Sequence, residues 1–283
     1  MASFTNFATL SYNGGTTNSN IVTGEILEAL TAVKTAVSAN YSAGDRITYA
    51  LSLVNTGTAA VTDYTVTDNL GGYTVGANTV YPLAYNAGTV RYYINGVLQT
   101  PPTVTAGPPL TVTGLTVPAG GSAVLIYETT ATPVAPLATG SSITNTATIT
   151  GAGLTNPITA QATVETANSA DLTISKALSP TTVTENGQIT YTFVISNTGN
   201  TEATATGNVV VTDTFAPILR NIAVTYNGTA WTEGTNYTYN AATGVFTTLA
   251  GQITVPAASF TQNTDGTFTV TPGTATLVIT GTV

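Results

Sequence analysis

Short stretches of alternating hydrophobic and polar residues recur along the whole chain. In two of them every second residue is apolar: Ile47, Tyr49, Leu51 and Leu53, and later Ile189, Tyr191, Phe193 and Ile195. Strict alternation is typical of a β-strand that buries one face. Asn95-Gly96 and Asn227-Gly228 lie between such stretches and suit tight hairpin turns. The pattern predicts a chain of short strands joined by turns.

An internal repeat divides the chain into two similar halves. Residues 30–34, 44–49, 55–57 and 66–68 return in the same order as residues 172–176, 187–191, 197–199 and 211–213. Each copy contains seven or so strand-like stretches, which is typical of an immunoglobulin-like β-sandwich. We therefore predict an all-β fold with two tandem immunoglobulin-like β-sandwiches, at residues 29–167 and 168–283.

Composition agrees with this fold and excludes several classes of function. Thr makes up nearly a quarter of the 283 residues, 42% of residues are hydrophobic and only 6% are charged, which suits strands around apolar cores. The chain has no Cys and no His, which excludes disulfides, thiolate metal sites, most zinc sites and a Ser-His-Asp triad. The net charge of −8 provides no basic face for nucleic acid and disfavours an anionic membrane surface.

The sequence also shows no clear targeting signal. No apolar run approaches the length that spans a membrane. The first residues lack the basic start and apolar core of a signal peptide, so either a leader was removed or the protein is not exported by that route. From these absences we expect a protein that is not an enzyme and that uses no cofactor and no metal.

Several motifs together resemble a known family. A strand with a Lys (residues 30–34), Asn-Thr-Gly (55–57), Val-Thr-Asp (66–68) and Ile-Thr-Asn-Thr-Ala-Thr-Ile (143–149) resemble the immunoglobulin-like conserved-repeat domain of bacterial surface proteins. The resemblance covers about residues 30–283 and implies an extracellular structural role. With two copies in 28.7 kDa and no visible leader, the chain also resembles the major ribbon-appendage subunits of clostridial spores, which implies a spore-surface location.

The second copy stops earlier than the first. In the first copy, the strand at 123–127 is followed by two further stretches, at 142–150 and 158–165. In the second copy, the matching strand at 275–279 is followed by four residues. A sandwich that lacks its last strand exposes apolar side chains and unpaired backbone groups, and these favour the addition of another strand.

The N-terminus matches the missing strand. Residues 3–11 are identical to residues 142–150 at five of nine positions. The alternation agrees as well, since one face carries Phe4, Asn6, Ala8 and Leu10 where the other strand carries Ile143, Asn145, Ala147 and Ile149. We therefore predict that residues 1–28 form a donor strand or hairpin that completes a second domain.

Two docking sites for the donor segment are compatible with this prediction. The donor segment either folds back onto its own second domain or completes that of a neighbouring chain by β-strand addition. We expect the neighbour, because tandem sandwiches usually run end to end and this separates the N-terminus from the open domain. A head-to-tail contact of this kind does not close on itself, so it produces a filament of identical subunits.

Three polar residues of each domain fall on inward-facing positions. The chain has only two lysines, and they occupy equivalent places in the repeat. An isolated buried charge costs too much to persist, so we expect each lysine to meet polar partners. The two expected sets are Lys34, Asp68 and Asn145, and Lys176, Asp213 and Asn6.

A Lys, an Asn and an acid inside an apolar core can form an isopeptide bond without another enzyme. Burial favours the neutral amine, which is the nucleophile, and a protonated Asp polarises the Asn carbonyl. The arrangement resembles the cross-links of Gram-positive pilins and adhesins. We predict bonds from Lys34 to Asn145 within a chain and from Lys176 to Asn6 of the next chain, with Asp68 and Asp213 as the acids. A buried ion pair with Asn hydrogen-bonded nearby is the alternative.

Rival residues exist for both roles. Asn55 and Asn197 also lie on apolar faces, but the Thr-Gly that follows each of them marks a turn, where Asn is common for local reasons. Glu128 is a rival acid in the first domain, and we place Gly281 at the matching position of the second. For these reasons we favour Asn145 as the acceptor and Asp68 as the acid in the first domain.

The sequence thus supports two classes of function. The favoured one is a structural subunit of a fibre on a spore or another extracellular surface, whose partner is itself. The alternative is a monomeric adhesin or carbohydrate-binding module with a host or environmental ligand. For that alternative a sugar-stacking platform could be built from Trp231, Tyr226, Tyr237 and Tyr239, although aromatic strand residues more often pack across strands.

Overall fold

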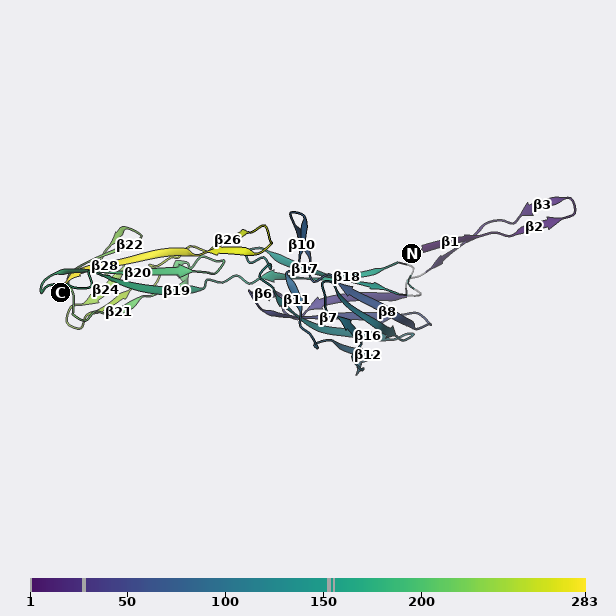
Figure 1. The fold of residues 1–283 in the computed structure, drawn as a ribbon, viewed down its shortest axis with the longest axis horizontal. Coiled ribbons are helices and arrows are strands. Elements are labelled where there is room, and N and C mark those ends of the chain that lie inside the picture. The colour runs from purple at the N-terminus through teal and green to yellow at the C-terminus, as the bar shows by residue number, and fades with distance from the viewer. Residues whose placement is uncertain (1, 27–28, 152–153, 155) are drawn as a thin grey trace. The chain divides into compact units, whose positions relative to one another are not determined.

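The computed structural model describes residues 2–26, 29–151, 154 and 156–283. These residues pack as two units. Unit 1 contains the described residues up to 135 together with 142–165, and unit 2 contains 136–141 and 166–283. The predicted domain start at residue 29 adjoins residues 27–28, which lie outside the described residues. Figure 1 shows that both units consist almost entirely of strands.

Unit 1 is a sandwich of two six-stranded antiparallel sheets. One sheet has the order β13 (Val97–Leu98), β12 (Arg91–Ile94), β16 (Ser122–Ala131), β7 (Arg46–Asn55) and β5 (Leu30–Ala36), with β11 (Leu83–Tyr85) also paired to β16. The other has the order β14 (Thr103–Thr105), β15 (Leu110–Val117), β8 (Val61–Asp68), β17 (Ser142–Thr150), β18 (Ile158–Thr166) and β6 (Asn40–Tyr41). A separate small hairpin pairs β9 (Tyr73–Val75) with β10 (Asn78–Val80).

Unit 2 repeats one sheet of unit 1 and only part of the other. The order β19 (Leu172–Ser179), β20 (Gln188–Asn197), β28 (Gly273–Thr282), β22 (Arg220–Tyr226) and β23 (Thr229–Trp231) corresponds to β5–β7–β16–β12–β13. The second sheet has β21 (Thr212–Thr214), β25 (Val245–Thr248) and β24 (Tyr237–Asn240), which correspond to β8, β15 and β14. Among the described residues of unit 2, nothing corresponds to β17 and β18. A short helical turn (Ala205–Gly207) and the hairpin β26 (Ser259–Gln262)–β27 (Phe268–Thr271) complete the unit.

The alternating patterns form the cores as predicted. All four inward residues of β7 and all four of β20 are buried. Both Asn-Gly pairs form the predicted hairpin turns: Asn95 and Gly96, like Asn227 and Gly228, have positive φ, the conformation that a two-residue hairpin turn of this kind requires. The prediction of an all-β fold with immunoglobulin-like sandwiches is confirmed.

The N-terminal segment forms a hairpin of its own, hereafter the N-terminal hairpin. β1 (Ala2–Asn6) pairs with β4 (Val22–Ile26), and β2 (Thr9–Tyr12) pairs with β3 (Gly15–Asn18) (Figure 1). In the described part of the chain, no ladder joins these strands to the sheets of either unit. The described side chains from residue 4 to residue 23 are all exposed, including the apolar Phe4 and Leu10 at 54% and 64%. Both faces of this hairpin are therefore open to solvent.

Helix plays almost no part in the fold. The described residues contain no helix that is long and apolar enough to cross a membrane.

Candidate cross-linking sites and an open sheet edge

Lys34 and Asp68 form a fully buried ion pair in unit 1. The alternation of β5 turns Lys34 inward, and Asp68 is the last residue of β8 in the opposite sheet. The Lys34 Nζ lies 2.5 Å from the Asp68 Oδ2, and the two side chains are 0% and 1% exposed. The ring of Tyr49 lies below the ammonium group, 4.8 Å from Nζ to the ring centroid. The pair thus joins the two sheets through the core.

The Asp68 carboxylate has further donors around it. The Tyr127 hydroxyl donates a hydrogen bond to the same Oδ2 that Lys34 contacts. The Leu70 N–H donates to the other oxygen at 2.9 Å. A buried carboxylate persists only when it is paired and hydrogen-bonded, and these three donors meet that need.

Asn145 lies in the same core with an unengaged amide. It faces inward from β17 and is completely buried, yet neither its Oδ1 nor its Nδ2 has a hydrogen-bond partner. Its amide lies beside the hydroxyls of Tyr49 and Tyr127 without hydrogen-bond geometry. Burial raises the pKa of both tyrosines, and the nearby amide offsets a small part of that rise. A buried carboxamide without a hydrogen-bond partner is costly as a structural feature alone.

Burial also changes the chemistry of Lys34. It lowers the pKa of the Lys34 amine from 10.5 to about 8, and the attraction of Asp68 offsets only part of that effect. At neutral pH about a tenth of the side chains would carry a neutral amine. In this neutral form Lys34 can act as a nucleophile.

The matching site of unit 2 has the same ion pair but not the same burial. The Lys176 Nζ lies 2.5 Å from the Asp213 Oδ2, and the side chains are 41% and 18% exposed. The Tyr191 ring, which matches that of Tyr49, lies 4.4 Å from Nζ. Where unit 1 has Tyr127, the strand register of unit 2 places Ile279. The site is chemically similar and structurally incomplete.

The exposure of Lys176 follows from an open edge of the smaller sheet. In unit 1, β17 pairs with β8 so that Ala147 lies opposite Asp68. In unit 2, β21 pairs with β25 on one side, and its other edge carries no strand among the described residues. Ile174 and Leu178 share the inward face of β19 with Lys176, yet Ile174 is 55% exposed and Leu178 is exposed as well. We call this uncovered face and edge the open groove.

The predicted donor residues lie in the first two strands of the N-terminal hairpin and in the break between them. Phe4 and Asn6 belong to β1, Leu10 belongs to β2, and Ala8 lies between the two strands. Gly24 lies opposite Phe4, and a Cβ added there would meet the Phe4 ring at 2.4 Å, so the ring rests on the glycine. Val22 lies opposite Asn6 and is exposed. Asn6 is exposed as well.

The rival acceptors form turns. The Asn55 Nδ2 donates to the carbonyls of Ala59, Val117 and Pro118, and its Oδ1 accepts from the Gly57 N–H at 3.0 Å. Asn197 makes the equivalent bonds in unit 2. Both amides are thus fully occupied by loop backbone, as the Thr-Gly that follows each of them indicated.

The rival acid faces away from the core. Glu128 follows Tyr127 on β16 and therefore points outward, where its Oε2 lies 3.6 Å from Arg46 Nη1 in an exposed ion pair. Our alignment of Glu128 with Gly281 was wrong. Glu128 lies opposite Thr48 in β7, and the matching Thr190 in β20 lies opposite Thr280. The match of residues 123–127 with residues 275–279 gives the same result, since it places residue 128 at residue 280.

The aromatic residues of unit 2 pack against one another and do not form an open platform. Trp231 stacks on Tyr226 with ring centroids 4.8 Å apart, and Tyr237 and Tyr226 are buried. The Tyr239 hydroxyl is held by the Leu219 backbone, at 2.8 Å from its carbonyl oxygen. Cross-strand packing, the structural interpretation of these residues, describes them better than sugar stacking does.

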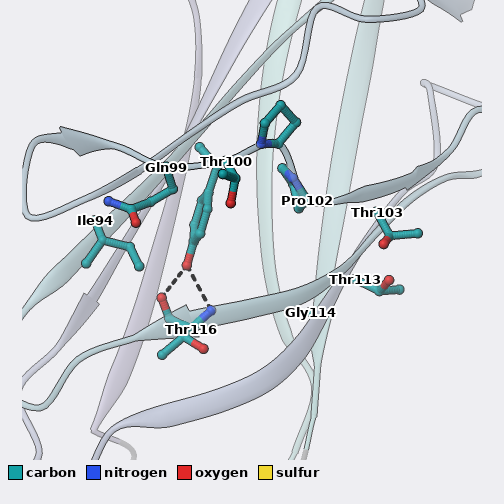
Figure 2. A pocket seen from close by; sticks show the side chains of 10 residues that line it. Ile94, Gln99, Thr100, Pro102, Thr103, Thr113, Gly114 and Thr116 are labelled. Atoms are coloured by element: carbon teal, nitrogen blue, oxygen red, sulfur yellow. Dashed lines mark hydrogen bonds between the residues drawn. The ribbon is translucent and has the colours of Figure 1, made fainter.

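Unit 1 has a shallow pocket beside β15, shown in Figure 2. Its wall contains Ile94, Gln99 and several Thr and Pro residues, and none of its lining residues is charged. The Tyr92 hydroxyl donates to the Thr116 carbonyl and accepts from the Thr116 N–H at 2.8 Å, so both of its hydrogen-bonding roles are used (Figure 2). The pocket offers no acid, base or nucleophile for catalysis.

Sequence reasoning missed the tyrosines of the cross-linking site. Tyr49 and Tyr127 were recognised only as apolar strand residues, although they stack with ring centroids 5.8 Å apart and border Asp68, Lys34 and Asn145. The available signal was a hydroxyl on a strictly inward face, since a buried Tyr needs a polar partner.

Comparison with known proteins gives matches in structure only. No protein-family model and no curated protein sequence matches the chain. The major pilin subunit BcpA of Bacillus cereus is 14% identical, with 96% of this chain and 73% of the pilin covered and a TM-score of 0.36. The pilus backbone RrgB of Streptococcus pneumoniae is 13% identical, with 86% and 55% covered and a TM-score of 0.35.

An adhesin gives a similar match over a shorter length. The N-terminal domain of the Streptococcus gordonii adhesin Sgo0707 is 16% identical, with a TM-score of 0.35, and the match covers 47% of this chain and about a third (32%) of that one. The chain is therefore similar to immunoglobulin-like domains of pilins and adhesins of Gram-positive bacteria. At these identities and TM-scores the likeness carries no functional argument, so the function is argued from the residues.

Proposed function

We propose that this chain is a structural subunit of a self-assembling extracellular fibre. Subunits join head to tail, because the N-terminal hairpin of one chain fills the open groove in unit 2 of the next. Two isopeptide bonds lock the fibre: Lys34–Asn145 within each chain and Lys176–Asn6 between chains. The single observation that carries the proposal is the open edge of β21 in unit 2, together with a hairpin of matching sequence whose faces are both exposed.

The N-terminal hairpin matches β17 in sequence. Its strand pair β1–β4 also matches the missing pair of strands in number. Unit 1 covers its lysine with β17 and β18, an antiparallel pair whose inner residues are buried. β1 and β4 are also an antiparallel pair, and β4 leads toward β5 as β18 leads toward β19. A hairpin that adds two strands to β21 would give unit 2 the same order as unit 1.

The matched register places the reactive groups together. With β1 and β2 aligned on β17, Asn6 takes the place of Asn145 and Ala8 takes the place of Ala147. Because Ala147 lies opposite Asp68 in unit 1, Ala8 would lie opposite Asp213. Asn6 would then lie over Lys176 as Asn145 lies in the core beside the Lys34 pair. A one-residue shift would turn Phe4, Asn6 and Leu10 to the outside, so burial selects this register.

Docking is favourable because it removes apolar surface from water. Burial of Phe4 and Leu10 contributes roughly 1.5–3 kcal/mol each. The exposed face of Ile174 and Leu178 is covered in the same step, and the unpaired edge of β21 gains hydrogen-bonded neighbours. These gains oppose the cost of holding two chains together.

The cross-linking reaction needs only groups that the fold supplies. The neutral Lys amine attacks the carboxamide carbon of Asn, and the Asp gives its proton to the departing nitrogen. The resulting carboxylate takes up the proton that the Lys nitrogen loses. A new C–N bond replaces the Asn C–N bond, and one ammonia leaves for each bond formed. Asp68 and Asp213 are regenerated, so each site reacts once and the protein has no turnover.

A contact between two different surfaces repeats without limit and builds a filament. The resemblance to bacterial surface repeats suggests an extracellular location, and the resemblance to clostridial ribbon appendages suggests the spore surface. The natural partner is then another copy of the chain.

A charge on the donor face tests the assembly. Leu10→Asp in the full chain should abolish fibres seen by electron microscopy, because it would place a charge in the groove. Leu10 is exposed in the free hairpin, so this variant keeps its fold. Thr5→Asp is the matched control: Thr5 lies on the opposite face, where the corresponding Thr144 is exposed, and fibres should persist. Fibres from Leu10→Asp would contradict donor-strand docking.

Intact mass under denaturing conditions tests the bonds. The wild-type chain should lack one ammonia as a monomer and should form a ladder of covalent multimers. In Asn145→Ala the monomer should no longer lack the mass of one ammonia, and the ladder of multimers should persist. In Asn6→Ala the ladder should disappear, and the monomer should still lack the one ammonia that the Lys34–Asn145 bond releases. Asn55→Ala controls for the rival acceptor and should change neither result. An unmodified mass with no ladder would limit the sites to ion pairs.

A further inference from the structure

The two lysine sites differ in how far water reaches them. Lys34 and Asp68 are closed off completely, while Lys176 and Asp213 are partly exposed. The difference extends along the strands: inward residues of β5 are buried or half-buried, but every residue of β19 after Leu172 is exposed. Among its described residues, unit 2 lacks strands that correspond to β17 and β18 of unit 1.

We infer that docking of the N-terminal hairpin from a second copy of this chain activates the Lys176 site, since it delivers Asn6 and removes water from Lys176 in one step. The inference rests on the proposed function and adds its regulation. Before docking, cross-linking is off because the site lacks both an acceptor and a dry environment.

The chemistry of the two states explains the switch. In the open groove, Lys176 and Asp213 form an ion pair that water stabilises, and an ammonium group has no lone pair for attack. Burial penalises both charges, which raises the share of pairs in which the proton has moved from Nζ to the carboxylate and both groups are neutral. The amine then attacks Asn6, the Asp213 proton goes to the departing nitrogen, and ammonia is released; the Asp213 carboxylate takes the proton that Nζ loses as it becomes an amide.

Unit 1 needs no such trigger. Lys34, Asp68 and Asn145 all come from one chain and are buried when unit 1 folds. The intrachain bond therefore forms during folding, and the interchain bond forms only after assembly. A free subunit should carry the first bond, and Lys176 should stay unreacted until a correct partner docks.

Acylation of the two lysines provides the test, with full chains throughout. Leu10→Asp keeps subunits free, and Asn6→Ala lets them dock without forming the bond. After a short pulse with an amine-acylating reagent, mass mapping should find Lys176 labelled readily in free Leu10→Asp. In Asn6→Ala assemblies labelling should be at least about tenfold slower. Asn145→Ala is added to both chains, so that Lys34 keeps a free amine and serves as the internal standard for a buried lysine.

A mixture of two variants then tests the reaction itself. Asn6→Ala supplies only Lys176 and Lys176→Ala supplies only Asn6, so the mixture should yield a covalent dimer lacking the expected ammonia. Asp213→Ala added to the Asn6→Ala chain should keep the association and abolish the covalent dimer. Dimer formation at an unchanged rate in that variant would overturn the role of Asp213.

The outcomes separate the inference from the function on which it rests. Asn6→Ala chains that stay monomeric by light scattering would overturn both. Chains that assemble while Lys176 is labelled as fast as in Leu10→Asp would leave docking intact and overturn the switch.

Discussion

The two lysines of this chain occupy matched positions in matched strands, but their surroundings differ. Each lies 2.5 Å from its aspartate and over a tyrosine ring. Lys34 is sealed by strands of its own unit, while Lys176 borders an uncovered edge. The comparison teaches that the reactivity of a buried lysine depends on the cover over it as much as on the residues beside it.

The sharpest way to test this comparison is to remove each lysine. In the Asn145→Ala chain, where Lys34 keeps its free amine, Lys34→Ala should destabilise the chain by about 3–5 kcal/mol, because it leaves Asp68 buried without its cation. Lys176→Ala, in the Leu10→Asp chain that stays free, should cost about 0–1 kcal/mol, as exposed ion pairs do. Urea denaturation measures both. Equal costs would show that the difference in burial has no energetic consequence.

The dependence of the free energy of unfolding on pH tests the effect of burial on Lys34 without removing the ion pair. In Asn145→Ala the Lys34 amine stays free, and its pKa is about 8 when folded against 10.5 when unfolded. Between these values the unfolded chain binds more protons, so the free energy of unfolding should rise with pH, by roughly 3 kcal/mol in full.

Other titrating groups limit the range of that measurement. The tyrosines that border Lys34 and Asp68 have a raised pKa in the fold, so their ionisation on unfolding lowers stability above about pH 10. The rise is therefore followed from about pH 8 to 9.5. Lys34→Met in the same background is the control, and a rise that persists in it would have another origin.

The hydroxyl of Tyr127 is present in one site and absent from the other, so its removal makes the two more alike. Tyr127→Phe should cost about 1.5–3 kcal/mol, because the lost hydrogen bond goes to a buried carboxylate. Tyr226→Phe is the matched control: its hydroxyl donates to the neutral Thr254 carbonyl, and its loss should cost about 0.5–1.5 kcal/mol. Thermal or urea unfolding measures both effects. A larger loss of stability in Tyr226→Phe than in Tyr127→Phe would contradict this expectation.

The smallest effect is expected for the rival acid. Glu128→Gln should change stability by less than about 1 kcal/mol, because the pair with Arg46 is exposed and long. The loss of ammonia from unit 1 should be unchanged in the intact mass. A chain that keeps its ammonia would assign the proton transfer to Glu128 in place of Asp68.

Much of the fold could be predicted from alternation alone. The faces of β7 and β20 and both Asn-Gly turns follow from local rules that operate within a few residues. The Lys34–Asp68 contact could be anticipated, since a charge on an inward face needs a partner. The Tyr127 hydroxyl on Asp68 could not, because it depends on which side chains from two sheets meet across the core.

Sequence by itself determined the strands, their faces, the two-fold repeat and the likeness of residues 3–11 to residues 142–150, because these are properties of order along the chain. Tertiary structure decided that β21 has an open edge and that Lys176 is exposed where Lys34 is not. Pairing and burial arise between distant segments, and a local pattern records a residue's face without recording what covers that face.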